Sequence, residues 1–141
     1  MYHDPTIRES ISRMVGQEVF SCQNEDEWMV ANYLTSVGDT HGWHLDDPPI
    51  AFVLVLLAPP KGEGGQLEYF PLSTKLAGVD VRHEHAMIAD HRAGDAYLLR
   101  ADQCLHRVAP LIGSGRRLAI NMAFEFDEEV TYGTTASMLY Q

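Results

Sequence analysis

The sequence predicts a mainly β protein, a sandwich or barrel of short strands preceded by one short helix. The first observation behind this is a series of short apolar segments from residue 50 onward, separated by turns rich in Gly, Pro and Asp. The second is an alternation of large apolar side chains with small or polar ones in the last segment. Because 141 residues is the size of one domain, we expect a single domain over 1–141. It comprises an N-terminal helix and lead-in (1–40), a β-rich core (41–126) and a tail (127–141).

The N-terminal helix is predicted from its capping residues and its apolar stripe. Asp4 is a good N-cap, Pro5 suits the first helical position, and Gly16 is a plausible end. The residues at helical spacing are Ile7, Ile11, Met14 and Val15. Residues 18–22 follow as a short predicted strand, whereas residues 27–34 fit either a helix or a strand.

Three strands are predicted in the middle of the chain. Residues 50–57 are continuously apolar and end at Pro59-Pro60, which is typical of a strand buried on both faces. Residues 66–70 and 96–100 follow turn sequences at 61–65 and 93–95. The regular spacing of these segments favours one continuous β domain without repeats or linkers.

The last predicted strand, residues 117–126, carries two distinct faces. Its large apolar residues are Leu118, Ile120, Met122 and Phe124, and the opposite face carries Arg117, Ala119, Asn121 and Ala123. Because the strand is otherwise apolar, these polar groups indicate a water-filled cavity on the second face.

Charge and composition exclude several functions. The formal net charge of −10 disfavours nucleic-acid binding, and it reflects either solubility or a cationic ligand. The longest apolar run, 50–58, is too short to span a bilayer, and residues 1–8 are polar. Cys22 and Cys104 are isolated, as expected for reduced thiols. We therefore expect a cytoplasmic protein with no nucleic-acid or membrane partner.

A metal-binding pattern is the main chemical signal. In an extended segment His44 and Asp46 point to the same side, so both can bind one metal ion, although a lone His-x-Asp pair is weak evidence. His106 lies downstream in the β-rich core, and Arg117 begins the alternating strand. Two histidines and one carboxylate with open positions form the Fe(II) site of non-haem oxygenases, and an arginine can bind a dicarboxylate through two hydrogen bonds.

These residues lie in segments that resemble the Fe(II)/2-oxoglutarate-dependent oxygenases. The resembling segments, which span most of the chain, are residues 41–47, 64–67, 94–102, 105–111 and 117–123. The resemblance implies a double-stranded β-helix, the jelly-roll or cupin-like fold. It also implies that His44, Asp46 and His106 bind Fe(II), that Arg117 binds 2-oxoglutarate, and that O2 is the oxidant.

Residues 38–44 and 97–102 are similar to one branch, the enzymes of free amino acids that include lysine halogenases and hydroxylases. Its acidic and amide substrate residues match Glu27, Asp47 and Asn121, with His41 near the same pocket. The halogenases carry a small residue where this chain has Asp46, so the resemblance implies hydroxylation of a small amine-bearing substrate, a free basic amino acid. Residues flanking the motifs are fewer than in that branch, so a homodimer that covers the pocket is possible.

Several alternatives stay open at this point. The substrate could be a peptide or a carrier-bound residue, or the chain could be a non-catalytic jelly-roll module that binds a metal or metabolite. Glu27 could be part of a solvated acidic run, and Asp47 could be an acidic residue of a loop. Asn121 could be a buried amide that satisfies backbone groups, and His41 could be a structural histidine. A second metal site at residues 82–85 lacks a third ligand, and His3 and His91 are expected to be exposed.

Overall fold

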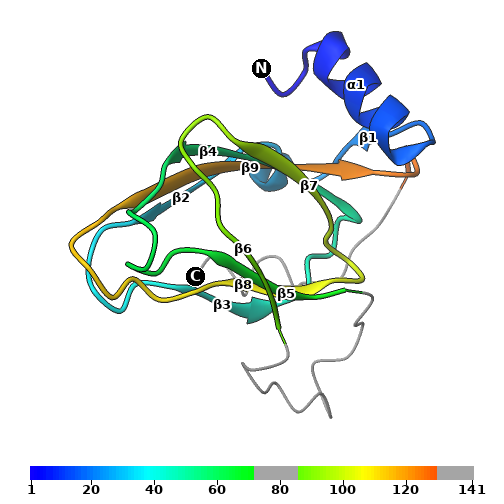
Figure 1. Ribbon diagram of the computed structural model, residues 1–141. Coiled ribbons are helices and arrows are strands. Elements are labelled where there is room, and N and C mark those ends of the chain that lie inside the picture. The colour runs from blue at the N-terminus through cyan, green and yellow to red at the C-terminus, as the bar shows by residue number, and fades with distance from the viewer. Residues whose placement is uncertain (72–85, 130–141) are drawn as a thin grey trace.

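Two antiparallel sheets face each other in the computed structural model, which describes residues 1–71 and 86–129 (Figure 1). The larger sheet has the order β1-β9-β4-β7, with β2 also paired to β9, and the smaller sheet has the order β3-β8-β5-β6. From β2 to β9 the chain passes back and forth between the sheets, with only β5 and β6 following each other in the same one, which confirms the double-stranded β-helix. The strands are Phe20–Ser21, Val30–Leu34, His41–His44, Ile50–Leu57, Leu67–Phe70, Met87–Ala89, Ala96–Arg100, Leu105–Val108 and Arg117–Glu125.

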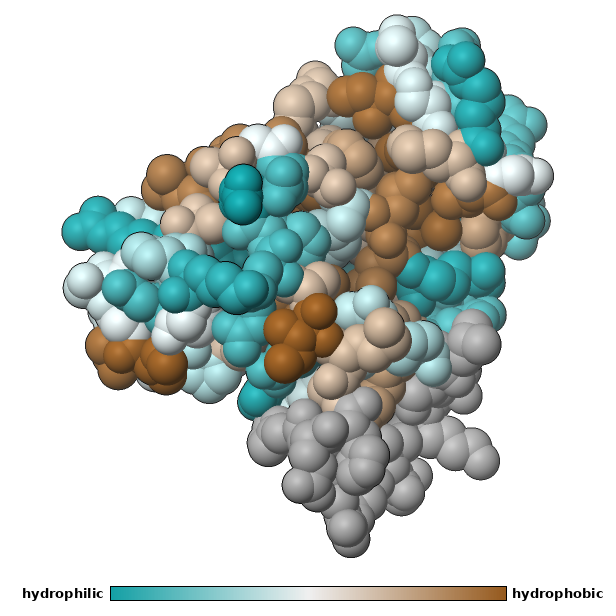
Figure 2. Space-filling model, viewed as in Figure 1, coloured by the Kyte–Doolittle hydropathy of each residue, from teal (hydrophilic) through white to brown (hydrophobic). Residues whose placement is uncertain are grey.

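The predicted helix is α1, Pro5–Val15, and both of its ends are as expected. The Asp4 side chain accepts a hydrogen bond from the Thr6 amide at 2.8 Å, and Gly16 ends the helix at φ 80°. Ile11 is buried against the outer face of the larger sheet, in one apolar cluster with Met122 and Phe124. Figure 2 shows hydrophobic side chains gathered where the helix meets the sheet. Met14 was expected in this stripe but is exposed.

The pairing of β4 with β9 forms the centre of the larger sheet. The register sets Ile50 opposite Phe124 and Val53 opposite Asn121. The two faces predicted for β9 are confirmed, since its large side chains face α1 and its small or polar ones face the smaller sheet. The prediction that β4 is buried on both faces is wrong at its end. Leu56 and Leu57 are exposed because the apolar cluster around α1 reaches only to Phe52.

The ambiguous segment at residues 27–34 contains neither a long helix nor one long strand. A single 3-10 turn, Glu25–Glu27, precedes the strand β2. The predicted strand at 18–22 is only the two residues of β1, and β6 was not predicted because its side chains are mostly exposed. Residues 82–85, considered above for a second metal site, lie outside the described residues. Across the described ranges, no helix has the length and apolar character needed to span a membrane.

Candidate metal centre

His44 and His106 lie side by side on neighbouring strands of the smaller sheet. The antiparallel register pairs them directly, at the end of β3 and near the start of β8. Their ring centroids are 4.2 Å apart, and both side chains are buried. Asp46 follows β3, and a backbone hydrogen bond of 3.0 Å from its amide to the Ala101 carbonyl fixes it there. The two strands therefore bring His106 beside His44 and Asp46, from which the sequence separates it widely.

The three side chains converge on one point. Asp46 Oδ1 lies 3.3 Å from His44 Nε2, and Asp46 Oδ2 lies 4.0 Å from His106 Nε2. One donor atom from each residue lies within 4.8 Å of the others. This spacing suits three ligands around a single ion, so the predicted triad is brought together as expected.

Backbone carbonyl groups fix the tautomers of both histidines. His44 Nδ1 lies 2.6 Å from the Gly42 carbonyl oxygen, and His106 Nδ1 lies 2.7 Å from that of Cys104. A carbonyl oxygen can only accept, so each Nδ1 carries a proton and donates it. Each Nε2 is thereby directed at Asp46 as a potential metal ligand.

The electrostatics of the triad are those of a site built for a cation. Burial opposes ionisation of Asp46, but the hydrogen bond from His44 and the nearby histidines lower the pKa of its carboxyl group below the ordinary value. Burial also opposes protonation of His44, yet Asp46 raises the pKa of its imidazole, whereas burial lowers the pKa of His106. A bound metal ion would displace the proton that Asp46 stabilises on His44.

His41 lies beside the triad without belonging to it. Its ring stacks on His44 with centroids 4.2 Å apart and planes inclined by 28°. Burial, with the nearby His44, lowers the pKa of His41 to about 4, so the ring is neutral at pH 7. A neutral ring of His41 therefore packs against the candidate metal ligand His44.

Arg117 comes from the larger sheet, at the end of the barrel away from the start of β8. Its side chain is buried and faces inward, and it interacts with the hydroxyl of Tyr97 on β7. The neighbouring Arg116 is exposed, in contact with the Tyr33 hydroxyl at 3.3 Å. The strand alternation thus separates the two arginines and turns only Arg117 towards the barrel interior.

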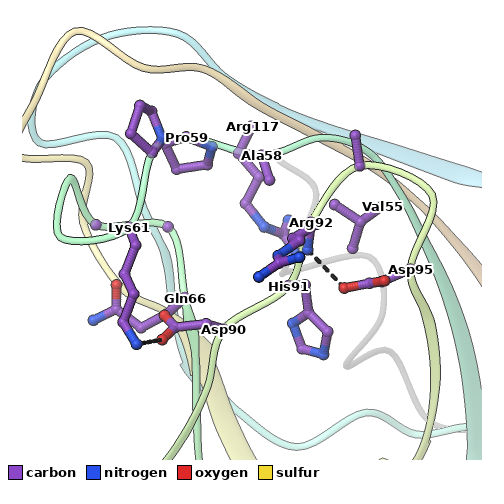
Figure 3. Close-up of a pocket in the computed structure, with 14 residues that line it drawn as sticks. Val55, Ala58, Pro59, Lys61, Gln66, Asp90, His91, Arg92, Asp95 and Arg117 are labelled. Atoms are coloured by element: carbon purple, nitrogen blue, oxygen red, sulfur yellow. Dashed lines mark hydrogen bonds and ion pairs between the residues drawn. The ribbon is translucent and has the colours of Figure 1, made fainter.

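A cavity of about 490 Å³ adjoins Arg117 (Figure 3). Val55, Gln66 and His91 contribute to its walls, and Lys61 and Asp90 form an ion pair at 3.3 Å beside them. None of the three candidate metal ligands lines this cavity. The cavity therefore reaches Arg117 but not the candidate metal ligands.

The predicted substrate residues Glu27, Asp47 and Asn121 lie towards the metal end. Glu27 ends the 3-10 turn, whose first residues are exposed while its own side chain is 6% exposed. Burial, followed by the charges of Asp46 and Asp47, raises the pKa of Glu27 to about 7. Asn121 lies inward on β9, and its Oδ1 accepts no hydrogen bond from the described residues.

Sequence reasoning missed two residues near the site, Glu125 and His91. Glu125 is 1% exposed, shares the inward face of β9 with Asn121, and contributes to the raised pKa of Glu27. Its position in the alternation was a usable signal. His91, expected to be exposed, is half-buried and stacks on Tyr97 with centroids 4.4 Å apart. No sequence pattern marks that contact, because it joins a loop to a strand.

Comparison with known protein families shows to which family this chain belongs. The sequence pattern of the family described as HalD, Halogenase D, matches residues 1–141. The chain belongs to the Halogenase D family. Among curated proteins, none matches it.

Solved structures share the fold of this Halogenase D family member at low identity. A 2OG-Fe(II) oxygenase family oxidoreductase from Burkholderia pseudomallei has a TM-score of 0.65 and 16% identity, covering 88% of this chain and 52% of its own. AviO1 from Streptomyces viridochromogenes Tue57 has a TM-score of 0.67 and 16% identity, covering 93% and 61%. A Pseudomonas putida prolyl-4-hydroxylase has a TM-score of 0.55 and 18% identity, covering 87% and 61%. The chain spans between half and two thirds of the length of these structures.

The residues present fit an iron ion. Two neutral imidazole nitrogens and one carboxylate on one side, with the other side open, form the donor set of non-haem Fe(II) oxygenases. The tautomers of His44 and His106 already direct Nε2 towards the centre, and Asp46 is ionised. The donor set of His44, Asp46 and His106 therefore fits an Fe(II) ion.

Proposed function

We propose that this protein is an Fe(II)- and 2-oxoglutarate-dependent oxygenase that hydroxylates a C–H bond of a small amine-bearing substrate, a free basic amino acid. The observation that carries the proposal is the position of Asp46. Its carboxylate lies between the Nε2 atoms of two facing histidines, with an inward arginine on the opposite sheet.

Each residue of the centre has a distinct role. His44, Asp46 and His106 hold the iron, while Arg117 pairs with the distal carboxylate of 2-oxoglutarate through its planar guanidinium. When bound, Fe(II), 2-oxoglutarate and O2 together supply the oxidant that attacks a C–H bond. The protein orients that bond and keeps water away from it.

The side chain of Asp46 favours hydroxylation within a family named after halogenases. A halide needs a vacant position on the metal. In this protein the carboxylate of Asp46 is available as the third protein ligand, beside the two histidines. Its two oxygens lie 3.3 Å and 4.0 Å from the histidine Nε2 atoms. Transfer of a hydroxyl group is therefore the reaction that we propose.

The substrate class follows from the acidic residues near the metal. Glu27, Asp47 and Glu125 bring three carboxylates to the same end of the barrel as Asp46, and each charge raises the free energy of the others. Asp47 Oδ2 and Asn121 Oδ1 are buried acceptors without a hydrogen bond from the described residues. An ammonium or guanidinium group offers both the charge and the donors that these residues lack, with His41 as a neighbouring wall.

The test is succinate formation by the Fe(II)-loaded protein with 2-oxoglutarate, O2 and a panel of amino acids, with products analysed by mass spectrometry. We expect amino-acid-dependent succinate and a product heavier by one oxygen atom. Arg117→Leu should abolish it, whereas the exposed neighbour Arg116→Leu should not. A chlorinated product would contradict the role of Asp46. Succinate independent of amino acids would favour a peptide or carrier-bound substrate, and none at all would favour a binding module. A cytoplasmic location, a single domain over 1–141 and a homodimer stay predictions from the sequence.

A further inference from the structure

The cavity beside Arg117 lies at the end of the barrel away from the metal centre. The Ala101 carbonyl, directly after β7, holds Asp46 at the metal end, so β7 begins at the other end. Two loops at that other end form most of the cavity wall, residues 58–66 after β4 and residues 90–95 before β7 (Figure 3). The roles described above leave this cavity unused.

The cavity leads from solvent to a buried guanidinium. On its outer side Lys61 and Asp90 form an ion pair whose side chains are 86% and 48% exposed. Arg117 also lines the cavity but is only 4% exposed, as is expected for the inner wall. A volume of about 490 Å³ is that of a small-molecule site, so a five-carbon dicarboxylate has room to pass.

Basic side chains outnumber acidic ones in the cavity lining, although the whole chain has twice as many acidic as basic residues. The basic side chains are those of Lys61, Arg92 and Arg117. Both acidic side chains already have partners, since Asp90 pairs with Lys61 and Asp95 accepts a hydrogen bond from the Arg92 amide at 2.7 Å. The lining therefore attracts an anion within an otherwise acidic protein.

The metal end of the barrel has the opposite character. Burial, followed by nearby carboxylates, raises the pKa of Glu27. Those carboxylates include Asp46, Asp47 and Glu125. A dianion that approached from this end would be repelled by these groups, whereas a cationic substrate would be attracted. Because the two organic reactants of the proposed reaction have opposite charges, the two ends of the barrel suit different reactants.

The order of groups along the barrel also fits entry through the cavity. Under the proposed function, 2-oxoglutarate directs its keto acid end to the metal and its distal carboxylate to Arg117. A molecule that enters through the cavity with the keto acid end first places the distal carboxylate last, at the arginine where the cavity ends. Entry from the metal end would require the distal carboxylate to pass the metal ligands first.

We propose that the cavity lined by Lys61, Arg92 and Arg117 is the passage through which 2-oxoglutarate enters and succinate leaves, separate from the acidic end that takes the amine-bearing substrate. The inference rests on the proposed function. Lys61 and Arg92 attract the dianion during entry and do not hold it in the final complex. Succinate can then leave while the hydroxylated product still occupies the acidic end.

The first test measures the rate constants of 2-oxoglutarate binding. Anaerobic stopped-flow absorbance on the Fe(II)-loaded protein follows formation and loss of the keto acid chelate. Lys61→Gln/Arg92→Gln should slow association about threefold to tenfold at low salt, less at high salt, and leave dissociation nearly unchanged. Arg8→Gln/Arg13→Gln removes the same charge from the exposed side of α1 and should change association less than about twofold.

The second test narrows the cavity without a change of charge. Ala58 lines the cavity away from the proposed cosubstrate site. Ala58→Trp should slow association and dissociation by the same factor, about threefold to tenfold, and leave Kd unchanged, because an obstacle on a route raises only the barrier. Ala31→Trp, at an exposed alanine of β2, is the matched control and should change neither rate constant.

The outcomes separate this inference from the function on which it rests. Unchanged rate constants in both cavity variants, or equal changes in the control variants, would overturn the passage. A weaker Kd in Ala58→Trp without slower dissociation would also overturn it, because the cavity would then be part of a binding site. If the wild-type protein forms no chelate with 2-oxoglutarate, or Arg117→Leu binds it as tightly, the proposed function itself fails instead.

Discussion

His44 and His106 are bound to the backbone in the same way: each donates its Nδ1 proton to the carbonyl oxygen two residues before it. The partners are Gly42 and Cys104, at 2.6 Å and 2.7 Å. Many metal-binding histidines are oriented by a neighbouring carboxylate that a mutation can remove. In this protein the main chain supplies the orienting groups, from Gly42 within β3 and from Cys104 directly before β8. The ligand geometry therefore depends on the sheet itself.

Metal affinity should distinguish the ligand Asp46 from its neighbour His41. We expect Asp46→Ala to weaken Ni(II) binding more than about 100-fold, because it removes a ligand, and His41→Phe to change it less than about tenfold. The phenylalanine preserves the stacking on His44 without a nitrogen. Calorimetric titration of both variants measures this, and equal losses would mean that His41 also binds the metal.

The buried Glu27 should make stability depend on pH. Folding raises the pKa of this carboxyl group from an ordinary 4.5 to about 7, so ionisation opposes folding. The stability that the protonated carboxyl group of Glu27 contributes is fully present below pH 4.5 and is lost as pH rises through 7. Metal-free Glu27→Gln should therefore gain on the order of 2 kcal/mol over wild type between pH 5 and pH 8. Urea unfolding at both pH values measures the gain, and a difference that is the same at both would place Glu27 in solvent.

The turn between β4 and β5 should depend on Gly64. A Cβ atom on Gly64 would lie within 2.9 Å of the Leu111 Cα and still closer to the Pro110 carbonyl oxygen, at a φ of +84°. Gly62 has φ +91° with open space around it, which makes Gly62→Ala the matched control. We expect Gly64→Ala to cost at least about 2 kcal/mol more than the control. Thermal and urea unfolding report this, and similar losses would show that the strain of positive φ dominates.

Tyr2 should anchor the N-terminal segment through its hydroxyl. The phenol donates to the Ala123 carbonyl at 2.6 Å and accepts from the Cys22 amide at 2.9 Å. Tyr2→Phe leaves both buried groups without this partner and should reduce the free energy of unfolding by about 1–3 kcal/mol. The exposed Tyr33→Phe should change it by less than about 0.5 kcal/mol. Equal effects in urea unfolding would show that the hydroxyl of Tyr2 contributes nothing.

The sequence was most informative where one local rule decided the structure. The cap at Asp4, the end at Gly16 and the alternation along β9 each follow from nearest neighbours, and all three are confirmed. The metal triad was predicted from the extended spacing of His44 and Asp46 and from the resemblance that implies His106, and the pairing of β3 with β8 brings the three together. What failed were statements about exposure, such as those for Met14 and Leu57, because exposure depends on which distant element covers a residue.

The parts of the site that sequence reasoning missed depend on contacts between elements. Glu27 looked like one member of an acidic run, and only the 3-10 turn separates its buried side chain from the exposed Glu25 and Asp26. The stacking of His91 on Tyr97 requires the loop after β6, a strand that was itself not predicted. Such pairings become visible only when the sheet order is known.

The triad and Arg117 belong to different walls of the barrel. His44 and His106 are paired within the smaller sheet, and Arg117 begins the last strand of the larger one. Packed sheets are held about 10 Å apart by the side chains between them. Ala51 and Ala119 are small residues buried in that layer. Under the proposed function, they therefore contribute to the distance that a dicarboxylate has to bridge between metal and arginine. Under the proposed function, larger residues at these two core positions would change which chain length of dicarboxylate the protein accepts, without contact with any metal ligand.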